Sequence, residues 1–257
     1  MKFVVAEKKT LITVLSLILI AVLLIIISGS VGGASSAYFG VTAKKLPICS
    51  VQTSQKDVAL TFDTAYGEDK TEGILDVLHE YGANATFFLI GFWVDNFPQK
   101  TQSIVDAGCE IGTHSDTHPH MTRLSPNECT NELALSIEKI EGFTKCPVRL
   151  FRAPYGEYSD KVITAAESLN LYTIQWDVDS FDWKQIPAAD IIKRVMSKVK
   201  NGSIILFHNN ADLILNFLPV ILHTLKDDGY SFKKVSDLIY KDNCKIDDKG
   251  TQIQLTN

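Results

Sequence analysis

Two histidines stand four residues apart in the segment His114-Ser-Asp-Thr-His118. Where such a segment curls into a turn or a helix, side chains at positions i and i+4 lie on one face, and two imidazoles so placed can share a metal ion. Two surface histidines in a polar loop are the simpler interpretation, and the pair alone does not exclude it. His120, which follows Pro119, is expected to be a solvated neighbour without a chemical role.

A carboxylate ends the apolar run Val58-Ala-Leu-Thr-Phe-Asp63. An aspartate in this place can cap a following helix, but Asp69 is better placed for that. Asp63 is therefore free to act as a base that takes a proton from a metal-bound water.

Three further segments carry residues capable of chemistry. Phe151–Gly156 puts Arg152 before a Pro and Gly turn whose backbone N–H groups can stabilise an oxyanion. Trp176–Trp183 is both aromatic and acidic, which is typical of clefts that bind sugars, and Ile204–His208 ends an apolar run with a histidine. Each segment also has a structural interpretation: an arginine paired with an acidic neighbour, an ordinary strand end, and a hydrogen-bonded structural histidine.

The elements that must position these residues alternate between short strand-like runs and longer segments of helical periodicity. This alternation predicts an α/β fold in which parallel strands are covered by helices. The expected strands are Val58–Thr64, Thr86–Ile90, Glu110–Ser115, Leu150–Ala153, Leu171–Asp177 and Ser203–His208, with a further one near Ser231–Lys234.

Helix starts are clearly marked. Ser125-Pro-Asn-Glu128 has a capping serine, a proline suited to the first helical position and a glutamate three residues after the cap, so a helix is expected from there to about Gly142. Ser159 and Asp160 open Lys161–Leu169 in the same way, and Asp69 opens Lys70–Tyr81.

The chemically capable residues fall at the carboxyl ends of the expected strands. In a parallel barrel these ends face one mouth, where such folds assemble active sites. Six polar side chains are predicted to converge there: Asp63, His114, Arg152, Asp177, Asp179 and His208.

Length and charge limit the function further. The chain has 257 residues and a net charge of -5, which allow one large domain and give no clustered positive charge for binding nucleic acid. Neutral sugars and small amides remain open as substrates. The five cysteines contain no C-x-x-C pair, and the sequence does not decide whether Cys49 joins Cys244 or Cys129 joins Cys146.

The N-terminus differs from the rest of the chain. Leu11–Ser28 is an uncharged apolar run long enough to span a bilayer as a helix, and it follows two lysines that are expected to stay in the cytoplasm. The sequence therefore predicts an anchor in residues 1–30, a linker in 31–50, one exported domain in 51–240 and a C-terminal tail in 241–257. Cleavage near Ala34-Ser-Ser-Ala37, which would release a secreted protein, is the alternative.

The order of the motifs resembles a known family. T-F-D at Thr61–Asp63, H-S-x-x-H at His114–His118, R-x-P-Y-G at Arg152–Gly156, D-x-x-x-W at Asp179–Trp183 and L-x-H at Leu206–His208 look like the five motifs of the polysaccharide deacetylases. The resemblance implies an irregular (β/α) barrel of about seven strands that removes N-acetyl groups from amino sugars, here most simply those of peptidoglycan in the cell wall.

The resemblance also implies a role for each motif residue. Asp63 would be the catalytic base, His114 and His118 would hold a divalent metal such as zinc, and His208 would be the acid that protonates the leaving amine. Supporting roles fall to Arg152, which orients the base, Asp179, which keeps His208 cationic, Tyr155, whose backbone N–H would bind the oxyanion, and Trp183 and Leu206, which would receive the acetyl methyl group.

One position departs from the family pattern. The first motif usually has a second aspartate that completes the metal ligands, and this chain has Thr64 there. A neutral hydroxyl is a poor substitute for a carboxylate, so metal affinity is expected to fall unless another group takes its place. Some wall-modifying and sporulation-associated branches of the family also depart at this position. The alternative to an enzyme is therefore a wall-binding or sporulation-associated scaffold that keeps the fold, and in either case a monomer is expected.

Overall fold

The computed structural model describes residues 13, 16–20, 44–67 and 70–255. The chain divides into two compact units, Met1–Lys44 and Lys45–Asn257, and the fold described below is that of the second. Among the described residues, no helix combines the length and hydrophobicity needed to cross a bilayer. Most of Leu11–Ser28 lies outside the described residues, so the anchor stays a prediction.

Strands and helices alternate along the second unit, as the sequence predicts. The strands are β1 (Ser50–Val51), β2 (Asp57–Thr64), β3 (Ala85–Leu89), β4 (Glu110–Thr113), β5 (Leu150–Phe151), β6 (Tyr172–Thr173), β7 (Val178–Asp179), β8 (Ile204–His208), β9 (Ser231–Lys233), β10 (Cys244–Ile246) and β11 (Thr251–Gln254). The helices are α2 (Thr71–Tyr81), α3 (Gly91–Asn96), α4 (Pro98–Asp106), α5 (Pro126–Thr144), α6 (Asp160–Ser168), α7 (Ala188–Met196), α8 (Ile214–Asp227) and α9 (Val235–Leu238), with 3-10 turns η1 (Met121–Arg123), η2 (Pro154–Gly156) and η3 (Asp182–Lys184).

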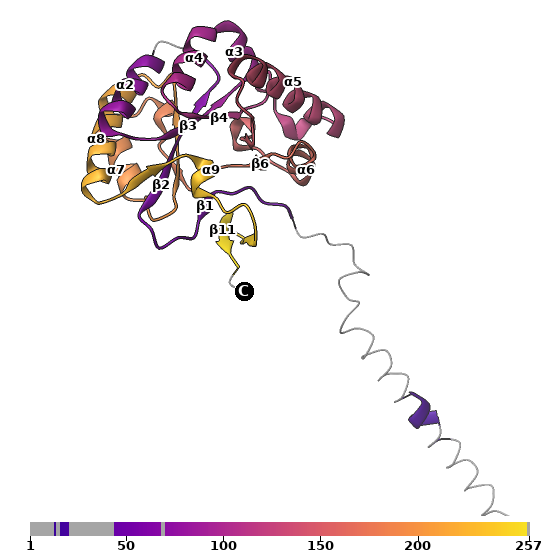
Figure 1. Cartoon of the computed structure of the whole chain (residues 1–257). Coiled ribbons are helices and arrows are strands. Elements are labelled where there is room, and N and C mark those ends of the chain that lie inside the picture. Colours follow the sequence, from indigo (N-terminus) through magenta and orange to yellow (C-terminus); the bar gives the residue numbers. More distant parts are fainter. Residues whose placement is uncertain (1–12, 14–15, 21–43, 68–69, 256–257) are drawn as a thin grey trace, which may run out of the picture. The chain divides into compact units, whose positions relative to one another are not determined.

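The main sheet has eight strands in the order β6-β5-β4-β3-β2-β8-β7, with β9 paired to the start of β2, and every pair is parallel. Helices surround the sheet (Figure 1). In the described part of the chain β6 and β7 do not pair, so the sheet is a curled half-barrel that hydrogen bonds do not close. The segment before β2 makes bridges to both sides of this gap, from Ile48 to Ile174 and from Ser50 to Ser203.

Alternation along β2 separates the core from the site, because successive side chains of a strand point to opposite faces. Phe62 belongs to the large cluster packed under the helices, with its ring centroid 4.8 Å from that of Phe87 and 5.6 Å from that of Phe207. Thr61 and Asp63, one residue to either side, therefore project from the opposite face, inside the curl of the sheet.

The predicted capping of α5 is confirmed. The Ser125 hydroxyl accepts from the Glu128 N–H at 3.4 Å, and the Glu128 carboxylate accepts from the Ser125 N–H at 2.7 Å. Ser159 likewise caps α6 through the Val162 N–H. Asp69 lies outside the described residues, so its capping role stays a prediction.

Two segments differ from their predicted structure. Of the single strand expected at Leu171–Asp177, only β6 forms, and the next strand, β7, begins just after the expected end. These two strands lie at opposite ends of the sheet order. The segment expected to be a tail, 241–257, contains β10 and β11, and β11 pairs in parallel with β1. All five cysteines are free, so neither of the candidate disulfides is formed in this structure.

Candidate active site

The carboxylate of Asp63 is held by a buried arginine. Arg152 Nη1 lies 2.8 Å from Asp63 Oδ1 and 2.9 Å from Thr61 Oγ1, and its Nη2 donates to the Gln175 carbonyl at 3.1 Å. The guanidinium carbon lies 4.2 Å from the centre of the Phe88 ring. Burial alone would raise the pKa of Asp63, but the charge and hydrogen bond of Arg152, together with His208, lower it. The carboxylate is therefore ionised at neutral pH and able to accept a proton.

His114 and His118 form a pair of neutral imidazoles. His114 Nδ1 lies 2.8 Å from the Arg152 carbonyl, which makes it the protonated nitrogen and leaves the Nε2 lone pair free, 3.6 Å from Asp63 Oδ2. The two rings are 4.9 Å apart. Burial lowers the pKa of both, and for His118 burial together with His114 brings it to about 4. His118 Nδ1 is buried and has no hydrogen-bond partner among the described residues.

The loop that carries these histidines is a turn rather than a helix. Ser115 has a φ of 74° and His118 a φ of 61°, both in the left-handed region. The Glu132 carboxylate on α5 accepts from the N–H groups of Asp116 and Thr117 at 3.1 and 3.0 Å and from the Thr117 hydroxyl at 2.9 Å. The pair predicted from i,i+4 spacing is thus brought together, by a turn that α5 fixes.

His208 is paired with Asp182, not with the predicted Asp179. His208 Nδ1 lies 2.7 Å from Asp182 Oδ1, and its backbone N–H donates to Asp182 Oδ2 at 2.8 Å. Burial would lower the pKa of His208, but Asp182, together with smaller contributions from Asp63 and Asp179, outweighs burial, and the pKa is raised. The β2–β8 register places His208 directly opposite Asp63.

Asp179 turns its carboxylate to its own loop. Its Oδ1 accepts from the Phe181 N–H at 2.9 Å, and burial raises its pKa. The reason Asp182 reaches His208 is local: Phe181 has a φ of 59°, and this left-handed residue starts the 3-10 turn that contains Asp182. An aspartate directly before Trp183 was visible in the sequence, but spacing alone does not tell which of two nearby carboxylates meets the histidine.

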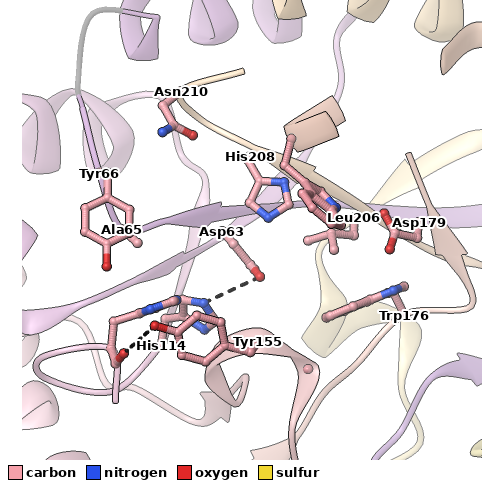
Figure 2. Close-up of a pocket in the computed structure, with 13 residues that line it drawn as sticks. Asp63, Ala65, Tyr66, His114, Tyr155, Trp176, Asp179, Leu206, His208 and Asn210 are labelled. Atoms are coloured by element: carbon pink, nitrogen blue, oxygen red, sulfur yellow. Dashed lines mark hydrogen bonds and ion pairs between the residues drawn. The ribbon is translucent and has the colours of Figure 1, made fainter. Parts of the chain in front are cut away.

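The motif residues line one pocket of about 500 Å³, within the roughly 300–1,000 Å³ of ordinary ligand sites. Figure 2 shows Asp63, His114 and His208 grouped at its centre. Tyr155, Trp183, Leu206 and Asp179 line it as well, with Tyr155 and Trp183 exposed. Asp177 does not line this pocket, because its carboxylate accepts from the Ser203 hydroxyl and the Ile204 N–H, each at 3.0 Å.

His120 is not the solvated bystander that its sequence context predicts. Its ring stacks on Tyr155 with centroids 4.1 Å apart, and its Nδ1 lies 3.1 Å from Glu157 Oε2. Tyr155 in turn contacts His118 edge to face at 4.5 Å. His120 therefore supports the pocket wall that Tyr155 forms.

The described residues do not fit a complete catalytic metal site. Catalytic zinc usually has three protein ligands, and no group of three or more His, Cys, Asp or Glu in this part of the chain is arranged to hold a metal ion. His114 and His118 supply two neutral nitrogens. Thr64 is fully buried, and its hydroxyl has no hydrogen-bond partner among the described residues, so position 64 adds no negative charge.

The fold and the motif residues have counterparts in known proteins. The family described as polysaccharide deacetylase matches residues 50–174. A peptidoglycan-N-acetylglucosamine deacetylase of Bacillus cereus is 33% identical over 194 residues, which cover 74% of this chain and 91% of that protein. The chain belongs to the polysaccharide deacetylase family. Members of this family are hydrolases that generally depend on a metal ion.

Other similar proteins carry different descriptions. The uncharacterized protein YlxY of Bacillus subtilis is 34% identical over 194 residues, which cover 75% of this chain and 60% of that protein. A crystal structure is known for a mutant of a Bacillus anthracis CE4 family pseudoenzyme, and this mutant is described as having restored enzymatic activity. Its sequence is 36% identical to this chain, and the two superpose with a TM-score of 0.73 over 75% of this chain and 70% of that chain. The chain spans 60% of the length of YlxY and about two fifths of the length of some other relatives.

Proposed function

We propose that this deacetylase removes N-acetyl groups from the amino sugars of peptidoglycan. One observation carries the proposal: an ionised carboxylate, Asp63, and a histidine with a raised pKa, His208, lie on paired positions of β2 and β8 and border one pocket. A base and an acid facing a single cavity are what amide hydrolysis requires. Similarity to proteins described as peptidoglycan deacetylases supports the choice of substrate.

The chemistry assigned to the chain's own residues is a two-step hydrolysis. Asp63, oriented by Arg152, takes a proton from water as that water attacks the acetamide carbonyl carbon. The oxyanion that forms is stabilised by the Tyr155 N–H, and protonated His208 gives its proton to the amine as the C–N bond breaks. Acetate and a free amino sugar are the products. Trp183 and Leu206 supply the apolar wall for the acetyl methyl group.

Acetate release tests this proposal. Purified full-length chain is incubated with N-acetylated peptidoglycan strands, with and without added divalent metals, and acetate and free amine are measured. Asp63→Asn and His208→Ala are each expected to lower the rate by about 10²–10⁴-fold, the usual contribution of a general acid or base. No release with any metal would overturn the enzyme assignment.

A second candidate function follows from Thr64. With a buried neutral hydroxyl at this position, the chain would bind acetylated glycan without turning it over, as a wall-binding or sporulation-associated scaffold. Glycan binding that persists in Asp63→Asn and His208→Ala, together with no acetate release by the parent chain, would favour this function. Acetate release that both substitutions abolish would exclude it.

We further propose that the deacetylase is exported and held at the membrane by Leu11–Ser28. The proposal rests on the apolar, uncharged composition of that segment and on the lysines before it. Before protease is added, the catalytic unit should be found in the membrane fraction. Protease added to intact cells should then digest it. Recovery of the unit in the culture medium would favour cleavage and secretion instead.

A further inference from the structure

An aromatic residue outside the five motifs borders the pocket. Tyr66 follows β2 on a short loop, and its side chain is 60% exposed. Its ring meets His118 edge to face, with centroids 5.7 Å apart. In Figure 2, Tyr66 and Trp176 lie on opposite sides of Asp63. Single exposed aromatics are common on proteins, so exposure alone does not make Tyr66 a binding residue.

The carbonyl of Gly67, the residue after Tyr66, accepts hydrogen bonds from two buried donors. Trp93 Nε1 donates to the Gly67 carbonyl at 2.7 Å, and Asn209 Nδ2 donates to the same oxygen at 3.1 Å. Both side chains are completely buried. The Asn209 backbone N–H also donates to the Asp63 carbonyl at 3.2 Å. The residue after Tyr66 is therefore tied to the end of the strand that carries the base.

We propose that Tyr66 is a stacking residue for the sugar next to the acetylated unit. This inference rests on the proposed function. The ring is uncharged, presents an exposed apolar surface and is continuous with the pocket, which suits the C–H face of a pyranose. Trp176 on the other side of Asp63 makes the pocket an aromatic-sided cleft with the acid and base between its walls.

Because the backbone directly after Tyr66 is already held, ordering it on binding costs little entropy, so a contact at the rim should appear mainly as affinity. If Tyr66 stacks on the neighbouring sugar, a single amino sugar placed for reaction lacks the unit that makes this contact. Tyr66 is therefore a specificity residue, and its signature is a dependence of binding on chain length.

Calorimetric binding to N-acetylglucosamine and to its tetramer tests the inference, using full-length chain with Asp63→Asn to prevent turnover. Adding Tyr66→Ala should weaken tetramer binding by about tenfold and change monomer binding by less than about twofold. Tyr66→Phe keeps the ring and should bind as the parent does, whereas Tyr66→Leu should behave like alanine. Phe92→Ala is the matched control, because Phe92 is 59% exposed and does not line the pocket.

The outcomes separate the inference from the function beneath it. If the parent binds the tetramer and Tyr66→Ala binds it equally well, or loses monomer and tetramer alike, the stacking role is wrong and the proposed function stands. If the parent binds neither ligand, both are wrong. Should the alanine variant fail to fold, the phenylalanine and leucine variants still decide, because a stacking role requires them to differ.

Discussion

Replacing Thr64 by aspartate should convert two imidazoles into a three-ligand metal site. Thr64 is fully buried at the end of β2, directly after the base, and its hydroxyl has no hydrogen-bond partner among the described residues. The pKa of His114 and that of His118 are both lowered, so both rings are neutral and able to coordinate without losing a proton. A carboxylate at position 64 would add the negative charge that the present pair lacks.

The magnitude follows from burial and from linkage. Without metal, a buried and unpaired carboxylate beside Asp63 should destabilise the fold by about 3–5 kcal/mol. With zinc at a hundred times its dissociation constant, the variant should regain about 2.7 kcal/mol, which is about 5–11 °C in Tm for a unit of this size. If the parent binds about a hundredfold more weakly, the same zinc concentration adds about 0.4 kcal/mol, or about 1–2 °C.

Thermal unfolding of the metal-free chain, followed by circular dichroism with and without zinc, measures both effects. Thr64→Asn is the matched control, because its amide has similar size and no charge. The expected pattern is a lower Tm for Thr64→Asp without metal and a large rise with zinc that the asparagine variant lacks. Equal zinc responses in the parent and in Thr64→Asp would refute the assignment of position 64 as the missing ligand.

Four further predictions concern the pairs that hold the site and one helix. Asp182 raises the pKa of His208 above its usual 6.5, so the alkaline fall of kcat/KM for acetate release should lie above pH 6.5. In Asp182→Asn this fall should move to lower pH, and an unchanged pH profile would count against the pair. The same pair should stabilise the fold fully below pH 6.5 and progressively less as pH rises through the raised pKa. Arg152→Met leaves Asp63 buried without its cation and should cost about 3–5 kcal/mol in urea unfolding. Ser125→Ala removes the α5 cap and should cost about 1 kcal/mol, measured as a lowering of Tm of about 2–4 °C.

The regular part of the fold follows from local sequence signals. β2, β3 and β8 are long apolar runs, and their predicted bounds agree with the structure to within one residue. The missed strands are short: β1 and β7 have two residues each, β10 has three and β11 has four. The pairing of β7 depends on the neighbouring strand rather than on its own pattern. The pairing of β1 with β11 joins residues 201 positions apart, a contact that no local pattern encodes.

The candidate site was predictable as a set of residues but not as a set of contacts. Motif order indicated which side chains meet, and the structure brings Asp63, His114, Arg152 and His208 together. Which of Asp179 and Asp182 meets His208 depends on the left-handed conformation of Phe181. The types of the neighbouring residues do not predict that conformation. Tyr66 was missed because the next residue, Gly67, is held by hydrogen bonds from Trp93 and Asn209, which are distant in sequence.

The two charged pairs weigh against a purely structural pocket. Arg152 is fully buried with Asp63, and taking both charges out of water costs several kcal/mol per ion that their attraction only partly returns. His208 and Asp182 add a second, largely buried pair next to the first. A fold that needed only a glycan-shaped cleft would be at least as stable with apolar side chains at these positions. Replacing Arg152 and Asp63 together by Met and Leu therefore separates the two functions: it should preserve or raise the free energy of unfolding while it abolishes acetate release.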